Sequence, residues 1–147
     1  MRILLGVSLL VIVAAARAED KPAGDLGLMQ GKWKTMVGPN KDIPVVLEIK
    51  GKKAKASFHD AEGKAMSIEG EVLLDEKADP KRLDWVHFTR PNGEEADPNL
   101  AIYKFNGDVL TICNGGPNNP RPTEFKNGDN GPPNLIVFEK VKDEESK

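Results

Sequence analysis

The stretch VVLEIKGKKAKASFHDAEGKAMSIEGEVLLD, residues 45–75, decides the fold class. It contains three runs in which apolar and polar residues alternate, at 45–50, 54–60 and 65–75, separated by short segments rich in Gly and Lys. In the first run, for example, Leu47 and Ile49 lie on the face opposite Glu48 and Lys50. A period of two is that of a β-strand with one buried face and one wet face. The stretch therefore predicts three consecutive antiparallel strands.

Similar runs continue on both sides of this stretch and bring the total to eight candidate strands: 31–37, 45–50, 54–60, 65–75, 82–89, 100–105, 109–113 and 135–141. Asn106-Gly107 is the strongest local hairpin signal, because both residues tolerate positive φ. One apolar face in each strand fits a sheet that curls on itself and leaves no exposed edge. We therefore predict an all-β domain, an eight-stranded antiparallel up-and-down β-barrel. A two-sheet β-sandwich is the alternative, because it produces similar alternation.

The first 18 residues have the three-part organisation of a secretory signal peptide. Arg2 is the positive start, ILLGVSLLVIVAAA at 3–16 is the apolar run, and ARA at 16–18 offers small residues for cleavage. The alternative is an N-terminal membrane anchor, but as a helix the run spans about 21 Å of a hydrocarbon core about 30 Å thick. We expect cleavage after Ala18 and an exported protein, either periplasmic or secreted.

The rest of the chain divides into a linker, one domain and a tail. Residues 19–27 are charged, contain Pro and Gly and lack an apolar period, which predicts a linker. The predicted barrel domain covers 28–141, and the charged residues 142–147 are expected to form a solvated tail. The 129 residues that follow the signal peptide suffice for one core.

Charge and cysteine content argue against several classes of partner. Without residues 1–18 the formal net charge changes from −2 to −4, and no basic run interleaved with aromatics is present, so we expect no nucleic-acid binding. No second apolar stretch is long enough to span a membrane. Cys113 is the only cysteine, and His59 and His87 lie 28 positions apart without ligand spacing, so neither a metal site nor a cofactor is expected.

Three motifs carry a resemblance to a known family. LMQGKWK at 28–34, IYKFNGDVLTIC at 102–113 and RPTEF at 121–125 occur in this order. In this respect the chain resembles a family of exported lipocalin-like domains of uncharacterised function that is abundant in planctomycetes. The resemblance runs from about Leu28 to Val141. It implies a lipocalin-type barrel and brings no catalytic residues.

The resemblance also implies a role for the Gly-x-Trp motif at 31–33. In lipocalin-like barrels this motif starts the first strand, and its tryptophan packs across the closed end, often under an arginine from a late segment. By this comparison Gly31 lets the backbone enter the strand close to its neighbours, and Trp33 closes the barrel. Arg121 of RPTEF is then the expected cation over the indole ring.

Alternation also suggests residues that face a possible cavity: Phe58, Met66, Trp85, His87 and Tyr103. Trp85 and His87 are two positions apart, so both could line the wall, the indole stacking on a ligand and the imidazole making a polar contact. The alternative is that Trp85 belongs to the core and His87 is exposed near the mouth. The small inward residues Ala54, Ala56 and Gly70 either leave room for a ligand or accommodate larger neighbours.

We therefore expect a non-catalytic exported protein that binds a small, mostly apolar molecule inside the barrel. The alternative is a protein-interaction or cell-envelope structural module with a solid barrel, which contacts partners through loops 90–99 and 114–134. No enzyme is expected, because the sequence has no nucleophile elbow, phosphate loop or HExxH motif, and Cys113 has no base near it in sequence.

Overall fold

Residues 22–142 are described by the structure, which is a computed structural model. The predicted signal peptide, the first part of the predicted linker and residues 143–147 of the predicted tail lie outside the described residues. No helix within 22–142 is both long and apolar enough to cross a membrane.

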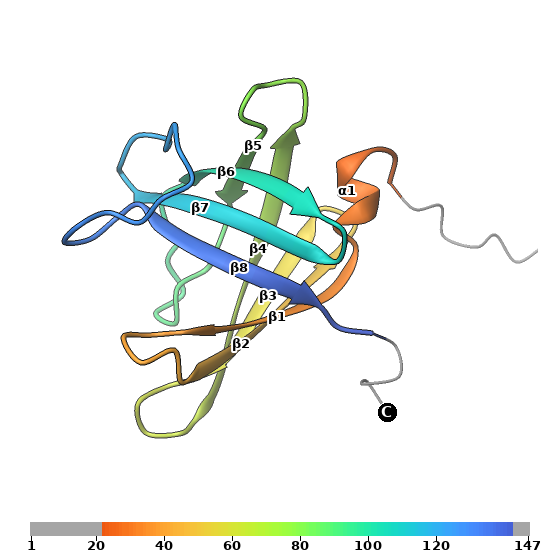
Figure 1. Cartoon of the computed structure of the whole chain (residues 1–147). Coiled ribbons are helices and arrows are strands. Elements are labelled where there is room, and N and C mark those ends of the chain that lie inside the picture. The colour runs from red at the N-terminus through yellow and green to blue at the C-terminus, as the bar shows by residue number, and fades with distance from the viewer. Residues whose placement is uncertain (1–21, 143–147) are drawn as a thin grey trace, which may run out of the picture.

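Eight antiparallel strands form one closed barrel, in which each strand pairs with the next and the last pairs with the first (Figure 1). The elements are α1 (Asp25–Leu28), β1 (Gly31–Val37), β2 (Ile43–Lys50), β3 (Lys53–His59), β4 (Ala65–Asp75), β5 (Arg82–Val86), β6 (Asn99–Asn106), β7 (Val109–Pro117) and β8 (Asn134–Lys140). The predicted up-and-down β-barrel is confirmed. The β-sandwich alternative is wrong, because a single continuous sheet closes on itself.

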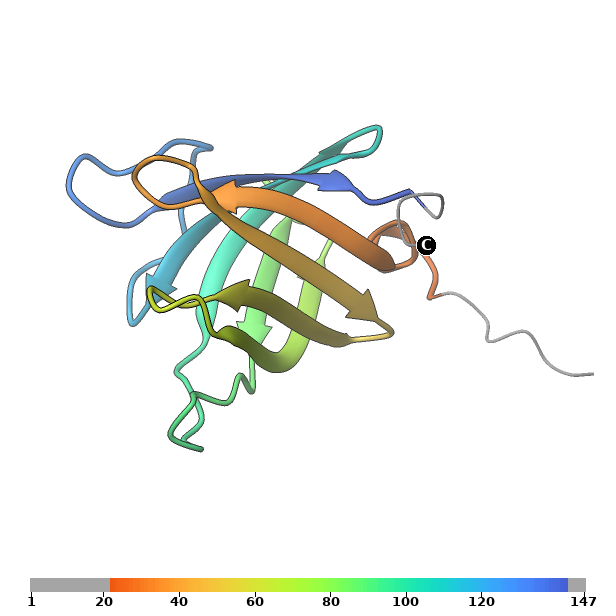
Figure 2. The same ribbon diagram turned by 90° about the horizontal axis from the view of Figure 1, so that it is seen from below.

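The two ends of the barrel differ in their connections. At one end, here called the closed end, short connections at 51–52, 76–81 and 107–108 meet the helix α1. At the other, the open end, the connections are 38–42, 60–64, 87–98 and 118–133. Figure 2 shows α1 at one end of the barrel and the long 118–133 loop at the other. The alternating direction of the strands thus places the two longest loops, 87–98 and 118–133, at the same end of the barrel.

The closed half of the barrel is filled by side chains. Trp33 is 1% exposed, and its Nε1 donates a hydrogen bond to the Met29 carbonyl oxygen at 2.9 Å. Its ring packs against Phe105, with centroids 6.1 Å apart, and Tyr103 meets Phe105 edge-on. Burial of these rings, complete for Trp33 and Tyr103 and partial for Phe105, contributes much of the core's stability.

α1 fastens the closed end through Asp25. Its Oδ2 accepts hydrogen bonds from Lys81 Nζ at 2.7 Å and from Tyr103 Oη at 2.8 Å, and its backbone N–H donates to Glu76 Oε2. Burial alone would raise the pKa of Asp25, but the hydrogen bonds from Lys81 and Tyr103 outweigh it and hold that pKa below its ordinary value. Burial and the neighbouring Asp25 carboxylate raise the pKa of Tyr103.

Residues 25–27 therefore differ from the linker predicted at 19–27. They belong to α1, and Gln30 just after the helix ties it to the β2–β3 turn, donating from Nε2 to the carbonyl oxygens of Leu26 and Gly51. A helix of four residues is too short to produce a helical period, which is why the sequence pattern missed it.

The cation over Trp33 is Lys140, not Arg121. Lys140 Nζ lies 5.2 Å from the centroid of the Trp33 ring, because β8 pairs with β1 at Trp33↔Lys140. Gly31 adopts φ 106°, a conformation that favours glycine, whereas an added Cβ would meet only Lys140 Cε at 3.8 Å. Backbone conformation, rather than the expected close approach, therefore accounts for this glycine.

Arg121 lies on the outside of the barrel wall. Its Nη1 is 2.7 Å from Asp84 Oδ1 and donates to the Ala101 carbonyl oxygen at 2.7 Å. Asp84 faces outward because its neighbours on β5, Leu83 and Trp85, face inward. Arg121 thus anchors the 118–133 loop to β5 and β6.

The seam between β1 and β8 is paired only near the closed end. These strands share two residue pairs, Trp33↔Lys140 and Lys34↔Glu139, whereas β7 and β8 share six. Thr35 Oγ1 extends the seam by donating to the Val137 carbonyl oxygen at 2.7 Å. Beyond this point the two strands diverge toward the open end (Figure 1). The gap between β1 and β8 therefore lies in the part of the wall beside the cavity described next.

Candidate ligand-binding cavity

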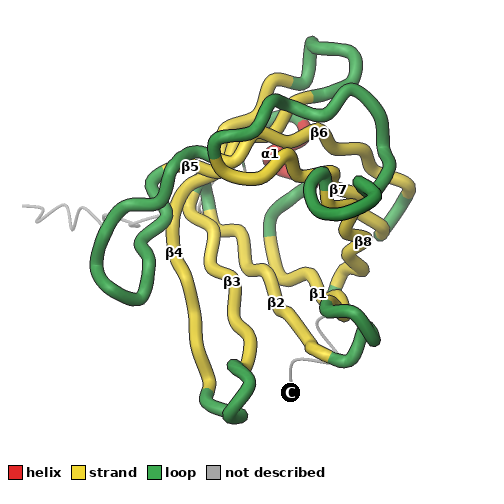
Figure 3. Tube along the Cα trace, turned by 90° about the vertical axis from the view of Figure 1, so that its left-hand side faces the viewer, coloured by secondary structure: helices red, strands yellow, loops and turns green. Residues whose placement is uncertain are grey.

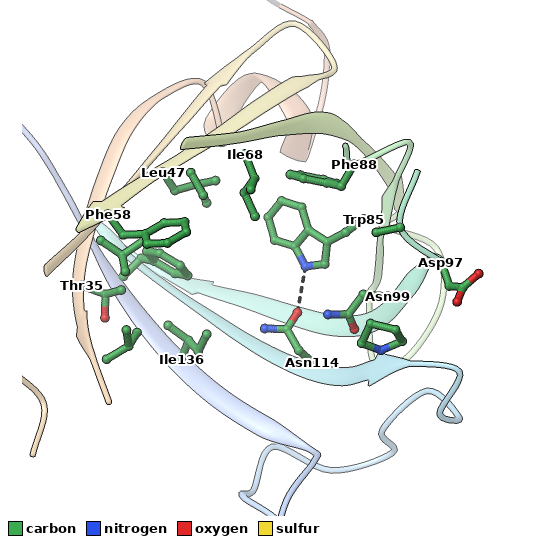
Figure 4. A pocket seen from close by; sticks show the side chains of 16 residues that line it. Thr35, Leu47, Phe58, Ile68, Trp85, Phe88, Asp97, Asn99, Asn114 and Ile136 are labelled. Atoms are coloured by element: carbon green, nitrogen blue, oxygen red, sulfur yellow. Dashed lines mark hydrogen bonds between the residues drawn. The ribbon is translucent and has the colours of Figure 1, made fainter. Parts of the chain in front are cut away.

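The open half of the barrel contains a cavity of about 470 Å³ (Figure 4). This volume lies within the range of about 300–1,000 Å³ that is typical of small-molecule sites. Twelve of the sixteen lining residues are apolar: Val37, Val45, Leu47, Ala56, Phe58, Ile68, Trp85, Phe88, Ala96, Pro117, Ile136 and Phe138. The other four are Thr35, Asp97, Asn99 and Asn114. The barrel interior is thus packed at one end and hollow at the other.

Trp85 is the largest side chain in the cavity wall. Its Nε1 donates a hydrogen bond to Asn114 Oδ1 at 2.8 Å, which fixes the ring across β5 and β7. Phe88 packs against it edge-on, with centroids 5.9 Å apart and an interplanar angle of 79°. The indole face is therefore held in place before any ligand arrives.

His87 does not share the inward face with Trp85. It adopts φ 55°, its side chain is exposed, and its Nδ1 lies 2.6 Å from Glu95 Oε1 in the 87–98 loop. Val86 pairs with Glu71, but the next ladder contact joins the Thr89 N–H to the Glu69 carbonyl oxygen, one residue later than a regular register gives. This is a β-bulge at His87.

The bulge turns Phe88 inward in the place that alternation assigned to His87. The Phe88 ring lies over Gly70, where an added Cβ would come within 2.3 Å of the ring. Gly70 therefore accommodates a large neighbour, the second of the two possibilities that the sequence left open. Ala54 is buried in the packed half, and Ala56 lines the cavity.

The remaining predicted residues are divided between the two halves of the barrel. Phe58 lines the cavity together with Trp85. Tyr103 does not, because it is fully buried at the closed end against Asp25. Met66 does not either: it pairs with Phe58 on β3, but it lies near the end of the β3–β4 hairpin, beyond the point where β4 stops pairing with β5 at Glu71. Figure 3 shows this end of the β3–β4 hairpin extending away from β6 and β7.

Asn99 and Asn114 were not predicted, although the alternation contains a signal for them. Asn114 is two residues after Ile112, and Asn99 two before Ala101, both of which face inward. Asn99 Oδ1 accepts a hydrogen bond from the Gly116 N–H at 2.9 Å. Asparagines at strand ends resemble turn residues, which is why a search for apolar liners passes over them.

Charge in the cavity is limited to one carboxylate at its rim. No Lys, Arg or His is among the described residues that line it. Asp97 lies on the 87–98 loop, is half exposed, and accepts a hydrogen bond from Asn118 Nδ2 at 2.9 Å; Arg90 Nη2 is 4.0 Å away. The interior itself is therefore neutral.

Cys113 and the histidines lie outside this cavity. Cys113 is fully buried, and its Sγ lies 3.4 Å from the Lys126 carbonyl oxygen. Within residues 22–142, no group of three or more His, Cys, Asp or Glu side chains is arranged to hold a metal ion.

Comparison of the chain with protein-family models, curated proteins and solved structures found no match. The resemblance to exported lipocalin-like domains therefore stays a prediction that rests on its three motifs.

Proposed function

We propose that this protein is a non-catalytic, exported binding protein that holds a small, mostly apolar molecule in the open half of its barrel. The observation that carries the proposal is the cavity of about 470 Å³ with its apolar lining. Burial of apolar ligand surface there would supply about 25 cal/mol for each Å² removed from water.

Three features of the wall support binding rather than packing. Trp85 and Phe88 are already oriented, so a ligand pays little to order them. The loops of the open end surround the mouth, and the β1–β8 seam is unpaired beside it. Most of the buried core lies outside the cavity lining, so stability does not require a filled cavity.

The proposal includes export and the absence of catalysis. Export rests on the signal-peptide pattern at 1–18. The absence of catalysis is proposed because the polar groups of the cavity lining are one carboxylate, two amides and one hydroxyl. The hydroxyl belongs to Thr35 and already donates a hydrogen bond to a backbone carbonyl oxygen. Such groups suit recognition of a ligand.

Tryptophan fluorescence tests binding directly, because the two tryptophans occupy different halves of the barrel. Trp85 lines the cavity and Trp33 is buried at the closed end. Titration with a lipophilic probe is expected to give a saturable change in emission. Trp85→Phe should abolish that change while the probe still binds, as measured by the probe's own fluorescence.

A matched pair of variants locates the site. Ala56→Phe adds a ring inside the cavity and should weaken probe binding at least tenfold. Ser57→Phe adds the same ring on the outer face of β3, one residue along, and should leave binding unchanged. Equal effects of the two variants, or no saturable response in the parent protein, would contradict the proposal and favour contacts through loops 90–99 and 114–134.

A further inference from the structure

The cavity contains two hydrogen-bond donors that the protein leaves without acceptors. Trp85 Nε1 and the Gly116 backbone N–H are donors only, so the amide oxygens of Asn114 and Asn99 must face them. The orientation of each carboxamide is thereby fixed, and its NH₂ group lies on the other side. Neither Nδ2 has an acceptor among residues 22–142.

These two NH₂ groups belong to one patch of the wall. Asn99 begins β6 and Asn114 lies on the adjacent β7, where the register shifts between Asn99 and Ala101. Figure 4 shows the two carboxamides on the same side of the cavity, beside the Trp85 ring, with the Asn99 nitrogen directed toward Asn114 and the Asn114 nitrogen directed away from Asn99. Both are half-buried, so water can solvate them while the cavity is empty. A ligand that expels this water must replace its acceptors or lose affinity.

The charge around the cavity indicates what kind of acceptor fits. No described cationic side chain lines the cavity, and the one charged liner, Asp97, is negative. A carboxylate or phosphate would lose its hydration without gaining a counter-ion. An uncharged oxygen acceptor such as a carbonyl gains hydrogen bonds from NH₂ groups without this cost.

We infer that the ligand is an uncharged molecule with an apolar body and a carbonyl-type oxygen, and that this oxygen accepts a hydrogen bond from the Nδ2 group of Asn99 or of Asn114. The inference rests on the proposed function and adds a chemical class to it. The apolar body lies along Leu47, Phe58 and Ile68, on the side of the cavity away from the two asparagines (Figure 4).

The test compares three probes of equal chain length on the whole protein: octan-2-one, octane and octanoate, each titrated by calorimetry. Asn114→Asp and Asn99→Asp keep the oxygen that accepts from Trp85 Nε1 or Gly116 N–H and replace the NH₂ donor by a second acceptor. At least one of the two variants is expected to weaken octan-2-one binding about tenfold more than octane binding. Octanoate should bind the parent protein at least tenfold more weakly than octan-2-one.

Asn106→Asp, at the exposed closed-end turn, is the control for added charge and should leave all three affinities unchanged. Equal losses for octan-2-one and octane in the cavity variants would overturn the inference while the proposed function stands. Tighter binding of octanoate than of octan-2-one would overturn the uncharged class. If no probe binds and the fluorescence titration also fails, the inference and the proposed function both fall.

Discussion

At the scale of single residues, Trp33 makes a large contribution to the stability of the closed end. Its indole is fully buried, donates to the Met29 carbonyl oxygen and packs on Phe105, while Lys140 covers it from β8. Loss of the ring would leave a cavity that the surrounding strands cannot close without breaking their register.

We expect Trp33→Ala to lower the free energy of unfolding by about 3–5 kcal/mol. Lys140→Ala removes only a cation–π contact that water reaches, and it should cost about 0.5–1 kcal/mol. Chemical denaturation followed by circular dichroism measures both. A Trp33→Ala protein that unfolds at the parent's denaturant midpoint would show that the indole does not close the barrel.

Single residues also show where sequence reasoning reaches its limit. Alternation correctly assigned Leu47 and Ile49 to the interior, because a regular strand obeys a period of two. It failed at His87, just after β5. The extra residue of the β-bulge there reverses which side chains face inward, so Phe88 takes the inward position. The apolar pair Val86 and Phe88 and the glycine at position 70 were the only signs of this change in the sequence.

At the scale of elements, the strands were predictable and the helix was not. The bounds of β1 and β4 match their predicted ranges, since turn residues such as Gly38 and Gly63 lie close to their ends. Residues 25–27 of α1 were predicted to belong to a linker. The position of this helix depends on hydrogen bonds from Lys81 and Tyr103 to Asp25, and these two residues lie 56 and 78 positions away in sequence. The expected Arg121 over Trp33 was wrong for the same reason: which cation lies over the ring depends on the pairing of β8 with β1.

The attachment of α1 predicts how stability depends on pH. The pKa of Asp25 is lower in the folded protein than its ordinary value of 3.8, so at pH values between these two pKa values the unfolded chain holds more protons. The stabilisation that the ionised Asp25 contributes is complete above the pKa that Asp25 has in the unfolded chain. It is lost as the pH falls through the pKa that Asp25 has in the folded protein. Unfolding measured from pH 7 to pH 2 should therefore show a loss of stability that begins near pH 4.

Asp25→Asn should remove that acid-dependent component and cost about 1.5–3 kcal/mol at pH 7, because hydrogen bonds to a buried charge are lost. Asp108→Asn, in the closed-end turn, is the control for the loss of one negative charge. An Asp25→Asn protein with the parent's acid profile would contradict the role assigned to this carboxylate.

At the scale of the whole molecule, the barrel separates stability from binding. The packed half, with α1 and the short turns, holds the fold, and the hollow half, with the long loops, holds the cavity. The up-and-down order of strands was readable from the sequence because each strand pairs with the next. The cavity was not readable, because its volume depends on how far side chains such as Phe58 and Phe138 reach across the interior.

Binding of a molecule in the open half is the central claim. The most direct measurement is a comparison of native and denaturing mass spectra of the protein purified from an exporting host. We predict a discrete extra mass that is present under native conditions, is lost on denaturation, and is absent from the Ala56→Phe variant. Bare polypeptide in both spectra, seen again after incubation with a lipid and metabolite extract, would contradict it.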